Sequence, residues 1–453
     1  MPSYVDTIAA LATPSGTSAI AVIRVSGPAA PTIAFSLSVD TLPPRLARRA
    51  DYKSTSGELI DSVLLVWFKG PKSYTGEDVL EISCHGNPFI AQKILADLFM
   101  RGCKPAGPGE FTQRAFLNGK LDLTQAEAVM DLIRASSDRA LAAANHQLRG
   151  DLGRRMEGLI ASLLNVLARI EAYIDFPEED LPPEDNDWIA RELDHLAQET
   201  DRLLATSRYG ELLRDGIKTV IVGAPNVGKS SLLNRLIGRE RALVSPEPGT
   251  TRDFIEERIV LGPHCLRIID TAGLNPSPAA LEKLGMEKTI ERLAEADLCL
   301  IVLDATRPTA TDLGDMLSRI PRRDRVLVVF NKSDLAPVVP RPADLQAEVQ
   351  IVRVSALTGA GMEELSSAIA TLADGLQNGA SGDFVAINAR HAQSLDEACE
   401  CLRHARKKLT IGESVELMAS DLRGTLVAYG EIAGKVDNER MLDQLFSSFC
   451  IGK

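Results

Sequence analysis

A chain of 453 residues is too long for one hydrophobic core, because domains usually contain about 100–200 residues, so we expect two or three domains. Its composition, 45% hydrophobic and 25% charged, contains no apolar run near the roughly 20 residues that cross a bilayer, which excludes a membrane-spanning protein. The net charge of −12 disfavours indiscriminate binding to nucleic-acid backbones but leaves room for a local basic site.

The seven cysteines predict neither disulfides nor a zinc site. No two of them form a C-x-x-C pair, which argues against structural zinc and against a redox dithiol. The first residues, Met1-Pro2-Ser3-Tyr4-Val5-Asp6, lack the basic start and apolar stretch of a secretory signal. We therefore expect a cytoplasmic protein with reduced thiols.

Residues 1–118 have the pattern of a mixed α+β domain. Short β-branched and apolar runs alternate with glycine and proline, which predicts strands over 19–25, 63–68 and 79–83. Apolar residues at helical spacing predict one helix over 90–100.

Helical spacing dominates after residue 118. Thr124-Gln125-Ala126-Glu127 fits a capping box, in which the Thr and Glu side chains satisfy amides of the first turn, so we predict a long helix starting there. Apolar residues recur at helical spacing as far as Ile170, and prolines at 177, 182 and 183 end the run. A second helix is predicted over 188–213.

From Lys218 the period changes to short apolar strands that alternate with helical stretches, which is typical of a mostly parallel sheet. The predicted strands cover 220–222, 266–269, 298–303, 326–330 and 351–354. After a linker rich in glycine, serine and asparagine, the helical pattern returns. A helical layer interrupted by an inserted α/β domain explains this order, because the two helical portions can then pack together.

A phosphate-binding motif begins directly after the first of these strands. The run from Gly223 to Ser230 matches G-x-x-x-x-G-K-S and precedes a predicted helix. Its glycines let backbone amides surround phosphates, Lys229 is expected to reach the β- and γ-phosphates and act in catalysis, and the Ser230 hydroxyl is expected to bind Mg²⁺.

Four further segments complete a guanine-nucleotide site. The segment 249–253 falls where a switch loop supplies Thr251 to Mg²⁺, and the D-T-A-G segment at 270–273 follows a strand. The N-K-S-D segment at 331–334 ends in an aspartate that accepts N1–H and the exocyclic amine of guanine, and the S-A-L segment at 355–357 completes the base pocket. The predicted GTP-binding residues are Asn226, Val227, Gly228, Lys229, Ser230, Ser231, Ser245, Pro246, Glu247, Pro248, Gly249, Thr250, Thr251, Asp270, Thr271, Ala272, Gly273, Asn331, Lys332, Ser333, Asp334, Ser355, Ala356 and Leu357.

These patterns predict a multidomain fold. We expect an α+β N-terminal domain (1–118), a discontinuous α-helical domain (119–212 and 379–453) and an inserted Ras-like α/β P-loop GTPase domain (213–378).

One position departs from Ras-like enzymes. Leu274 follows the D-T-A-G segment, where those enzymes carry the glutamine that orients the attacking water. Another group must therefore complete catalysis. Glu282 and Glu287 lie downstream in the second switch, although a glutamate on a helix usually belongs to a solvated face.

The chain resembles the MnmE (TrmE) family of bacterial tRNA-modification GTPases, of the TrmE-Era-EngA-like P-loop class. The resemblance covers essentially the whole chain. It is carried by the nucleotide motifs and by the segments G-E-D-V-L-E (76–81), H-G (85–86), P-G-E-F (108–111), R-A-F-L-N (114–118), K-L-D-L (120–123) and F-C-I-G-K (449–453).

The resemblance implies an N-terminal domain that binds folate and dimerises, so that the protein is a homodimer. It also implies a partner, the FAD-containing MnmG (GidA) flavoprotein, in a heterotetramer or larger complex that acts on tRNA. Together they attach an aminomethyl-type group to carbon 5 of the wobble uridine.

The resemblance further assigns site residues. It places 5-formyl- or 5,10-methylene-tetrahydrofolate near Arg24, Glu81, Lys120 and Lys453, and the water-orienting role at Glu282. It places K⁺ at Asn226, Ser245, Glu247 and Thr250, in place of an arginine finger. The family has an arginine where this chain has Asn275.

Several alternatives stay open. The basic run 403–408 either contacts tRNA phosphates or forms a solvated helix face, and Cys450 is either a reactive thiol beside the folate or a packing residue. A different class of function is a ribosome-assembly GTPase that binds rRNA, yet no basic RNA-binding module is evident in the sequence. A third is a self-sufficient folate-dependent aminomethyl transferase in which the GTPase only regulates.

Overall fold

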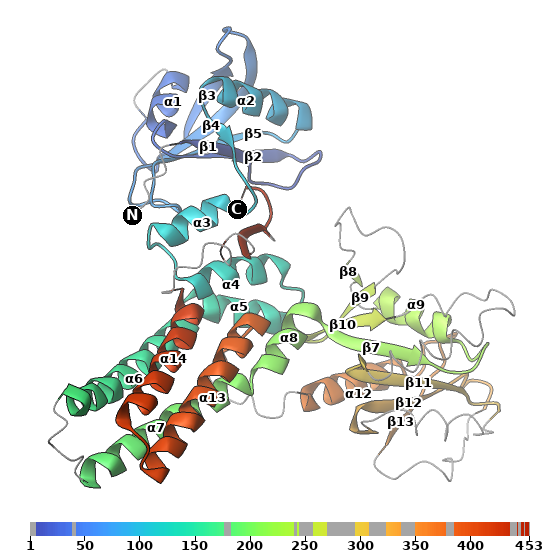
Figure 1. Ribbon diagram of the computed structural model, residues 1–453. Helices are drawn as coiled ribbons and strands as arrows, with labels where there is room; N and C mark the ends of the chain where they lie inside the picture. The colour runs from blue at the N-terminus through green and yellow to red at the C-terminus, as the bar shows by residue number, and fades with distance from the viewer. Residues whose placement is uncertain are drawn as a thin grey trace, which may run out of the picture. The chain divides into compact units, whose positions relative to one another are not determined.

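The computed structural model in Figure 1 describes most of the chain. The chain divides into two compact units. The described residues are 6–38, 42–175, 183–239, 242–243, 257–269, 295–307, 323–336, 349–376, 385–434, 442, 445–447 and 449–452. The first unit contains Met1–Met130, Leu148–Asn165 and Leu426–Lys453, and the second contains Asp131–Gln147 and Val166–Thr425.

A six-stranded sheet forms the core of the first unit, in the order β3-β4-β5-β2-β1-β6. Its strands are β1 (Ile8–Leu11), β2 (Ile20–Ser26), β3 (Arg48–Lys53), β4 (Leu59–Phe68), β5 (Val79–His85) and β6 (Lys104–Pro105). Neighbours are antiparallel except for the β1–β6 pair. Because side chains alternate between the faces of a strand, every second residue of β2 enters the core.

Two helices cover this sheet with apolar residues, and a third follows them. They are α1 (Ala30–Leu37), α2 (Pro88–Met100) and α3 (Glu110–Leu117). Ile33 of α1 and Ile94 of α2 pack in one cluster with alternate residues of the strands. Helix α2 begins where Asn87 accepts a hydrogen bond from the Phe89 amide. The predicted strands and the helix over 90–100 are confirmed, whereas α1, α3 and three strands were not predicted.

The long helix predicted from Thr124 to Ile170 is wrong, because the structure contains three helices there. They are α4 (Leu123–Arg134), α5 (Asp138–Leu148) and α6 (Asp151–Asp175). The chain turns at Ser137, whose hydroxyl caps α5 by accepting from the Ala140 amide. It turns again at Gly150, whose φ of +84° favours glycine.

The predicted capping box is also displaced by two residues. The Asp122 carboxylate accepts from the Gln125 amide at 2.8 Å, and the Gln125 side chain accepts from the Asp122 amide at 2.9 Å. Asp122 is therefore the N-cap of α4, and Thr124 lies inside the first turn, where its hydroxyl donates to Asp122.

Helices from before and after the inserted domain pack side by side in the second unit (Figure 1). They include α7 (Pro183–Leu204) and α13 (Ala389–Ile411), while α8 (Ser207–Asp215) follows α7 and α14 (Val415–Ala433) follows α13. Arg406 Nε lies 2.9 Å from Asp194 Oδ1 across the α7–α13 pair. The predicted helix over 188–213 is thus two helices, but the expected packing of the two helical portions is confirmed.

A seven-stranded sheet forms the α/β part of the second unit, in the order β13-β12-β11-β7-β10-β9-β8. Its strands are β7 (Ile217–Val222), β8 (Ala242–Leu243), β9 (Glu257–Leu261), β10 (His264–Ile269), β11 (Leu298–Asp304), β12 (Val326–Asn331) and β13 (Gln350–Arg353). The five strands from β13 to β10 are parallel, β9 is antiparallel to β10, and β8 is antiparallel to β9. The short helix η2 (Arg323–Arg325) precedes β12.

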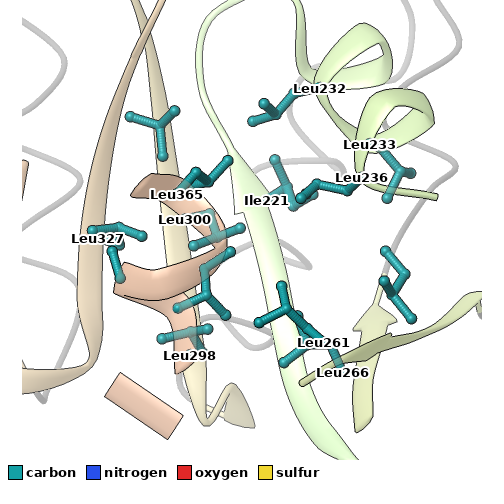
Figure 2. Close-up of a cluster of buried hydrophobic side chains, with 14 of the residues drawn as sticks. Ile221, Leu232, Leu233, Leu236, Leu261, Leu266, Leu298, Leu300, Leu327 and Leu365 are labelled. Carbon is teal, nitrogen blue, oxygen red and sulfur yellow. The ribbon is translucent and has the colours of Figure 1, made fainter. Parts of the chain in front are cut away.

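Helices α9 (Lys229–Arg239) and α12 (Met362–Gly375) bury one face of this sheet. Figure 2 shows Leu232 of α9 and Leu365 of α12 among the side chains packed with Ile221 and Leu300 of the strands. Because both faces of β11 and β12 are buried, these strands are continuous apolar runs. Among the residues described, no helix is both long and apolar enough to cross a bilayer.

Candidate nucleotide-binding site

The glycine-rich loop lies between β7 and α9, at the carboxyl edge of the parallel strands. A Cβ atom on Gly223 would lie 2.2 Å from the Val302 carbonyl oxygen, and one on Gly228 would lie 2.2 Å from Asn331 Nδ2. Both glycines also have positive φ. Only glycine therefore fits these positions, which brings the loop backbone close to its neighbours and leaves its amides at the N-terminus of α9.

Lys229 supplies a positive charge at the start of α9. Its Nζ donates to the Gly223 carbonyl at 2.8 Å and to the Ala224 carbonyl at 3.0 Å. Burial lowers the pKa of this ammonium below its ordinary value. A half-buried cation beside a helix N-terminus favours an anionic ligand such as phosphate.

The side-chain amide of Asn331 ties three loops together. Its Nδ2 donates to the Val227 carbonyl at 2.8 Å, and its Oδ1 accepts from the Ala356 amide at 3.0 Å. Asn331 is 2% exposed, so these bonds replace water on a buried polar group. The sequence placed Asn331 in the base-reading motif, and the structure adds that it joins this motif to the phosphate loop and to the S-A-L segment.

Lys332 makes a second connection between the same loops. Its Nζ donates to the Asn226 carbonyl at 2.9 Å and to Asp304 Oδ2 at 2.6 Å. Asn226 and Lys332 both have positive φ, +65° and +64°. These are uncommon values for residues with a Cβ.

The remaining described residues of the predicted base pocket differ in burial. The Ser333 amide donates to the Val354 carbonyl at 3.1 Å, and Asp334 in the following turn is exposed. Ser355 is buried and accepts from the Thr358 amide, whereas Leu357 is exposed. The structure therefore brings the predicted phosphate and base segments together at one edge of the sheet, where ligands of open α/β sheets bind.

Several predicted residues lie outside the described part of the chain. They are Ser245, Pro246, Glu247, Pro248, Gly249, Thr250, Thr251, Asp270, Thr271, Ala272, Gly273, Asn275, Glu282 and Lys453. The Mg²⁺ ligand Thr251, three of the four K⁺ ligands and the catalytic Glu282 therefore stay predictions.

Sequence reasoning missed Asp304, which contacts Lys332 of the base-reading motif. Its signal was available, because Asp304 directly follows the strand predicted over 298–303, and in the structure it ends β11 beside the strand that ends at Asn331. Polar side chains at the carboxyl ends of adjacent parallel strands fall at the same edge of a sheet.

Arg24 and Glu81, predicted to bind folate, meet in the first unit. They are cross-strand partners on β2 and β5, and Arg24 Nη2 lies 2.9 Å from Glu81 Oε1. The Arg24 guanidinium also lies 5.4 Å from the Tyr74 ring centroid and 5.8 Å from that of Phe111. Lys120 has a different partner, the Pro71 carbonyl at 2.9 Å.

The C-terminal segment belongs to the first unit and contacts the residues that precede α3. Ile451 forms an isolated β-bridge with Pro108, and the Gly109 amide donates to the Cys450 carbonyl. The Cys450 side chain is exposed. A packing role for this thiol is therefore not supported by burial.

In the basic run 403–408, two side chains have acidic partners. Arg406 pairs with Asp194, and Lys408 Nζ lies 2.8 Å from Asp421 Oδ2. These pairs favour the solvated helix face over a phosphate-binding surface.

The glycine-rich loop, its lysine and the tethered N-K-S-D loop at the edge of a parallel sheet define a P-loop GTPase. Two family models match the chain: "GTP-binding protein TrmE N-terminus" over residues 7–120 and "MnmE helical domain" over residues 123–450.

Relatives match over the full length, and each is named tRNA modification GTPase MnmE. The protein of Opitutus terrae is 58% identical, with 100% of both chains covered. The proteins of Akkermansia muciniphila and Symbiobacterium thermophilum are 46% and 41% identical, with 99% of both chains covered. The chain therefore belongs to the MnmE family of tRNA modification GTPases, and it is an enzyme that hydrolyses GTP.

Proposed function

We propose that this chain is a potassium-dependent GTPase of tRNA wobble-uridine modification. With a flavin partner of the MnmG type, it adds an aminomethyl or carboxymethylaminomethyl group to C5 of the uridine, using a tetrahydrofolate one-carbon unit. It works in the cytoplasm as a homodimer. The observation that carries the proposal is the pair of hydrogen bonds between Asn331 and the residues Val227 and Ala356, which join three segments predicted to bind guanine nucleotide in a chain that matches its relatives end to end.

In this proposal the predicted site residues bind the nucleotide and orient it for hydrolysis. Lys229 and the amides at the start of α9 hold the phosphates, and Asp334 reads the guanine edge. Ser230 and Thr251 hold Mg²⁺, which neutralises charge on the phosphates when bound. Glu282 orients the attacking water, since Leu274 has no group for that role.

Potassium takes the place of an arginine finger. A cation beside the phosphates stabilises the charge that develops in phosphoryl transfer. Asn226 fits this role because its backbone is fixed by the bond from Lys332 to its carbonyl, which leaves its side-chain oxygen as a ligand. Ser245, Glu247 and Thr250 complete the proposed ligand set.

The folate site is proposed around the Arg24–Glu81 pair. Arg24 lies over two aromatic rings, and Glu81 offers a carboxylate that accepts hydrogen bonds. A flat heterocycle with donor groups along one edge, and an acidic tail, complements this combination.

The test is mass spectrometry of wobble uridines in tRNA from a strain that lacks this gene. We expect the modified uridine to disappear, to return with the wild-type gene, and not to return with Lys229→Ala. Unchanged uridines in the deletion strain would contradict the role in tRNA.

Purified protein should also hydrolyse GTP faster in K⁺ than in Na⁺ at equal ionic strength, and Asn226→Ala should reduce that difference. Modification of tRNA by the purified protein alone would favour the self-sufficient transferase.

A further inference from the structure

Asp304 is the last residue of β11, and in the parallel register it lies opposite Asn331 of β12. Both of its carboxylate oxygens are used. Oδ1 accepts from the Thr306 amide at 2.9 Å and from the Thr306 hydroxyl at 2.7 Å, while Oδ2 accepts from Lys332 Nζ at 2.6 Å. The carboxylate is thus fixed on one side and presents its other oxygen to Lys332 of the base-reading motif.

Lys332 carries this contact to the phosphate loop. The same Nζ that meets Asp304 donates to the carbonyl of Asn226 at 2.9 Å. Asn226 and Lys332 both have backbone angles in the left-handed region, which costs a residue with a Cβ about 1 kcal/mol or more. Such conformations persist where surrounding contacts stabilise them. The hydrogen bond from the Lys332 ammonium to the Asn226 carbonyl joins the two residues that have these conformations.

We propose that Asp304 is a positioning residue for guanine-nucleotide binding. By holding the Lys332 ammonium against the Asn226 carbonyl, it fixes the phosphate loop relative to the base-reading loop. Asp304 acts through Lys332 and not by touching the nucleotide. The inference rests on the proposed nucleotide site.

The charge of Asp304 is secure under physiological conditions. Burial alone would raise the pKa of this carboxyl, but the hydrogen bonds from Lys332 and Thr306 outweigh it and lower the pKa to about 2. The carboxylate therefore stays ionised at neutral pH. A neutral amide at this position cannot replace it, because its oxygen can accept from either Thr306 or Lys332, while its NH₂ group faces a donor on the other side.

The experiment measures the dissociation rate of a fluorescent GDP analogue from the full-length protein. For Asp304→Asn we expect dissociation about tenfold faster, the equivalent of roughly 1.4 kcal/mol. The KM for GTP should rise, while kcat at saturating GTP stays within about twofold because Asp304 does not touch the reacting atoms. A merely structural defect would lower the active fraction and hence kcat.

Asp297→Asn is the matched control. Asp297 directly precedes β11, at the opposite end of the strand, and its carboxylate accepts from the Lys218 amide at 3.1 Å. The two aspartates have nearly equal side-chain exposure, 13% and 15%. The same substitution at Asp297 should leave GDP dissociation at the wild-type rate.

A double-mutant cycle with Lys332→Met tests whether Asp304 acts through the lysine. If it does, Asp304→Asn adds little to the dissociation rate in the Lys332→Met background. The inference would be overturned if the two substitutions multiplied each other's effect on the GDP dissociation rate. It would also be overturned if GDP dissociated from Asp304→Asn at the wild-type rate. Should Asp304→Asn fail to fold, Thr306→Val replaces it: loss of one bond to Oδ1 should speed dissociation about twofold, and an unchanged rate counts against the role.

The outcomes separate this inference from the proposed site itself. If the wild-type protein fails to bind GDP, the nucleotide site is wrong. If the wild-type protein binds GDP, and GDP dissociates from both Asp304→Asn and Thr306→Val at the wild-type rate, only the proposed role of Asp304 is wrong.

Discussion

The nucleotide site of the second unit and the Arg24–Glu81 pair of the first unit are assembled in different ways. The nucleotide site is built from short contiguous segments, each of which follows a parallel strand. The carboxyl ends of parallel strands lie at one edge of the sheet. The sequence of each motif, which follows a strand, therefore predicts where the motif lies in the fold. Arg24 and Glu81 are far apart in the sequence and meet only through the antiparallel register of β2 and β5.

Charged residues of the first unit also include a fully buried example. Arg114 is 0% exposed and pairs with Asp6, Glu77 and Glu110. Burial alone would lower its pKa, but the hydrogen bond that Arg114 donates to Glu110 and the three acidic neighbours raise it. A buried arginine of this unit can therefore pair with acidic residues within the chain, and the ion pair of Arg24 does not by itself indicate a ligand. The ligand role of Arg24 needs a direct test.

The largest expected effect tests the motif-built site. Asp334→Asn should weaken GTP binding by about two orders of magnitude, because an amide donor then faces the donors of guanine and the two hydrogen bonds to the carboxylate are lost. The variant should gain affinity for xanthosine nucleotides, which carry an oxygen in place of the exocyclic amine. Calorimetric titration with both nucleotides measures the change.

Asp324→Asn serves as the control, since it makes the same substitution in the exposed turn before β12. It should leave both affinities unchanged. A wild-type GTP affinity for Asp334→Asn, with no gain for xanthosine, would remove the assignment of the base-reading motif.

The motifs show what could be predicted from the sequence. The parallel strands and the phosphate loop have strong local signals, because apolar runs, glycine spacing and Lys229 each constrain the backbone nearby. The capping residue of α4 did not have such a signal. Asp122 and Thr124 both suit an N-cap, and the choice depends on tertiary packing that places Leu123 in the core. Asp304 had a positional signal, because it directly follows a predicted strand, but its role depends on where Lys332 lies.

An intermediate effect tests the pair made by register. If folate binds there, Arg24→Ala should raise the folate dissociation constant about tenfold, since a charge-assisted hydrogen bond is lost. GTP hydrolysis by the other unit should not change. Calorimetry with 5-formyl-tetrahydrofolate measures the constant.

Lys93→Ala is the control, because it removes another ion pair of the same unit, the exposed contact with Glu58. An unchanged folate constant for Arg24→Ala would mean that the Arg24–Glu81 pair is structural, as the Arg114 cluster is.

The smallest expected effect sharpens the comparison, because it concerns a polar contact in the second unit that no motif encodes. His264 begins β10 and is buried, and its Nε2 lies 3.0 Å from Asp374 Oδ1 of α12. Arg139 of α5 lies 2.9 Å from the same oxygen. Burial and the charge of Arg139 lower the pKa of His264, against the opposing influence of Asp374. Tyr209 also belongs to this network, and burial raises its pKa.

The direction of the pH dependence follows from this lowered pKa. Between the folded pKa of His264 and its unfolded value near 6.5, the unfolded chain binds more protons than the folded one. The contribution of His264 to the free energy of unfolding is therefore fully present above about pH 6.5 and decreases as the pH falls through that window. NMR titration of histidine-labelled protein reports the pKa directly, with His264→Gln to assign the signal. Arg139→Gln should raise the pKa of His264 and Asp374→Asn should lower it further, because one removes a repelling charge and the other an attracting one. If both substitutions shift it in the same direction, the change reflects altered packing, and the contact does not control the charge of His264.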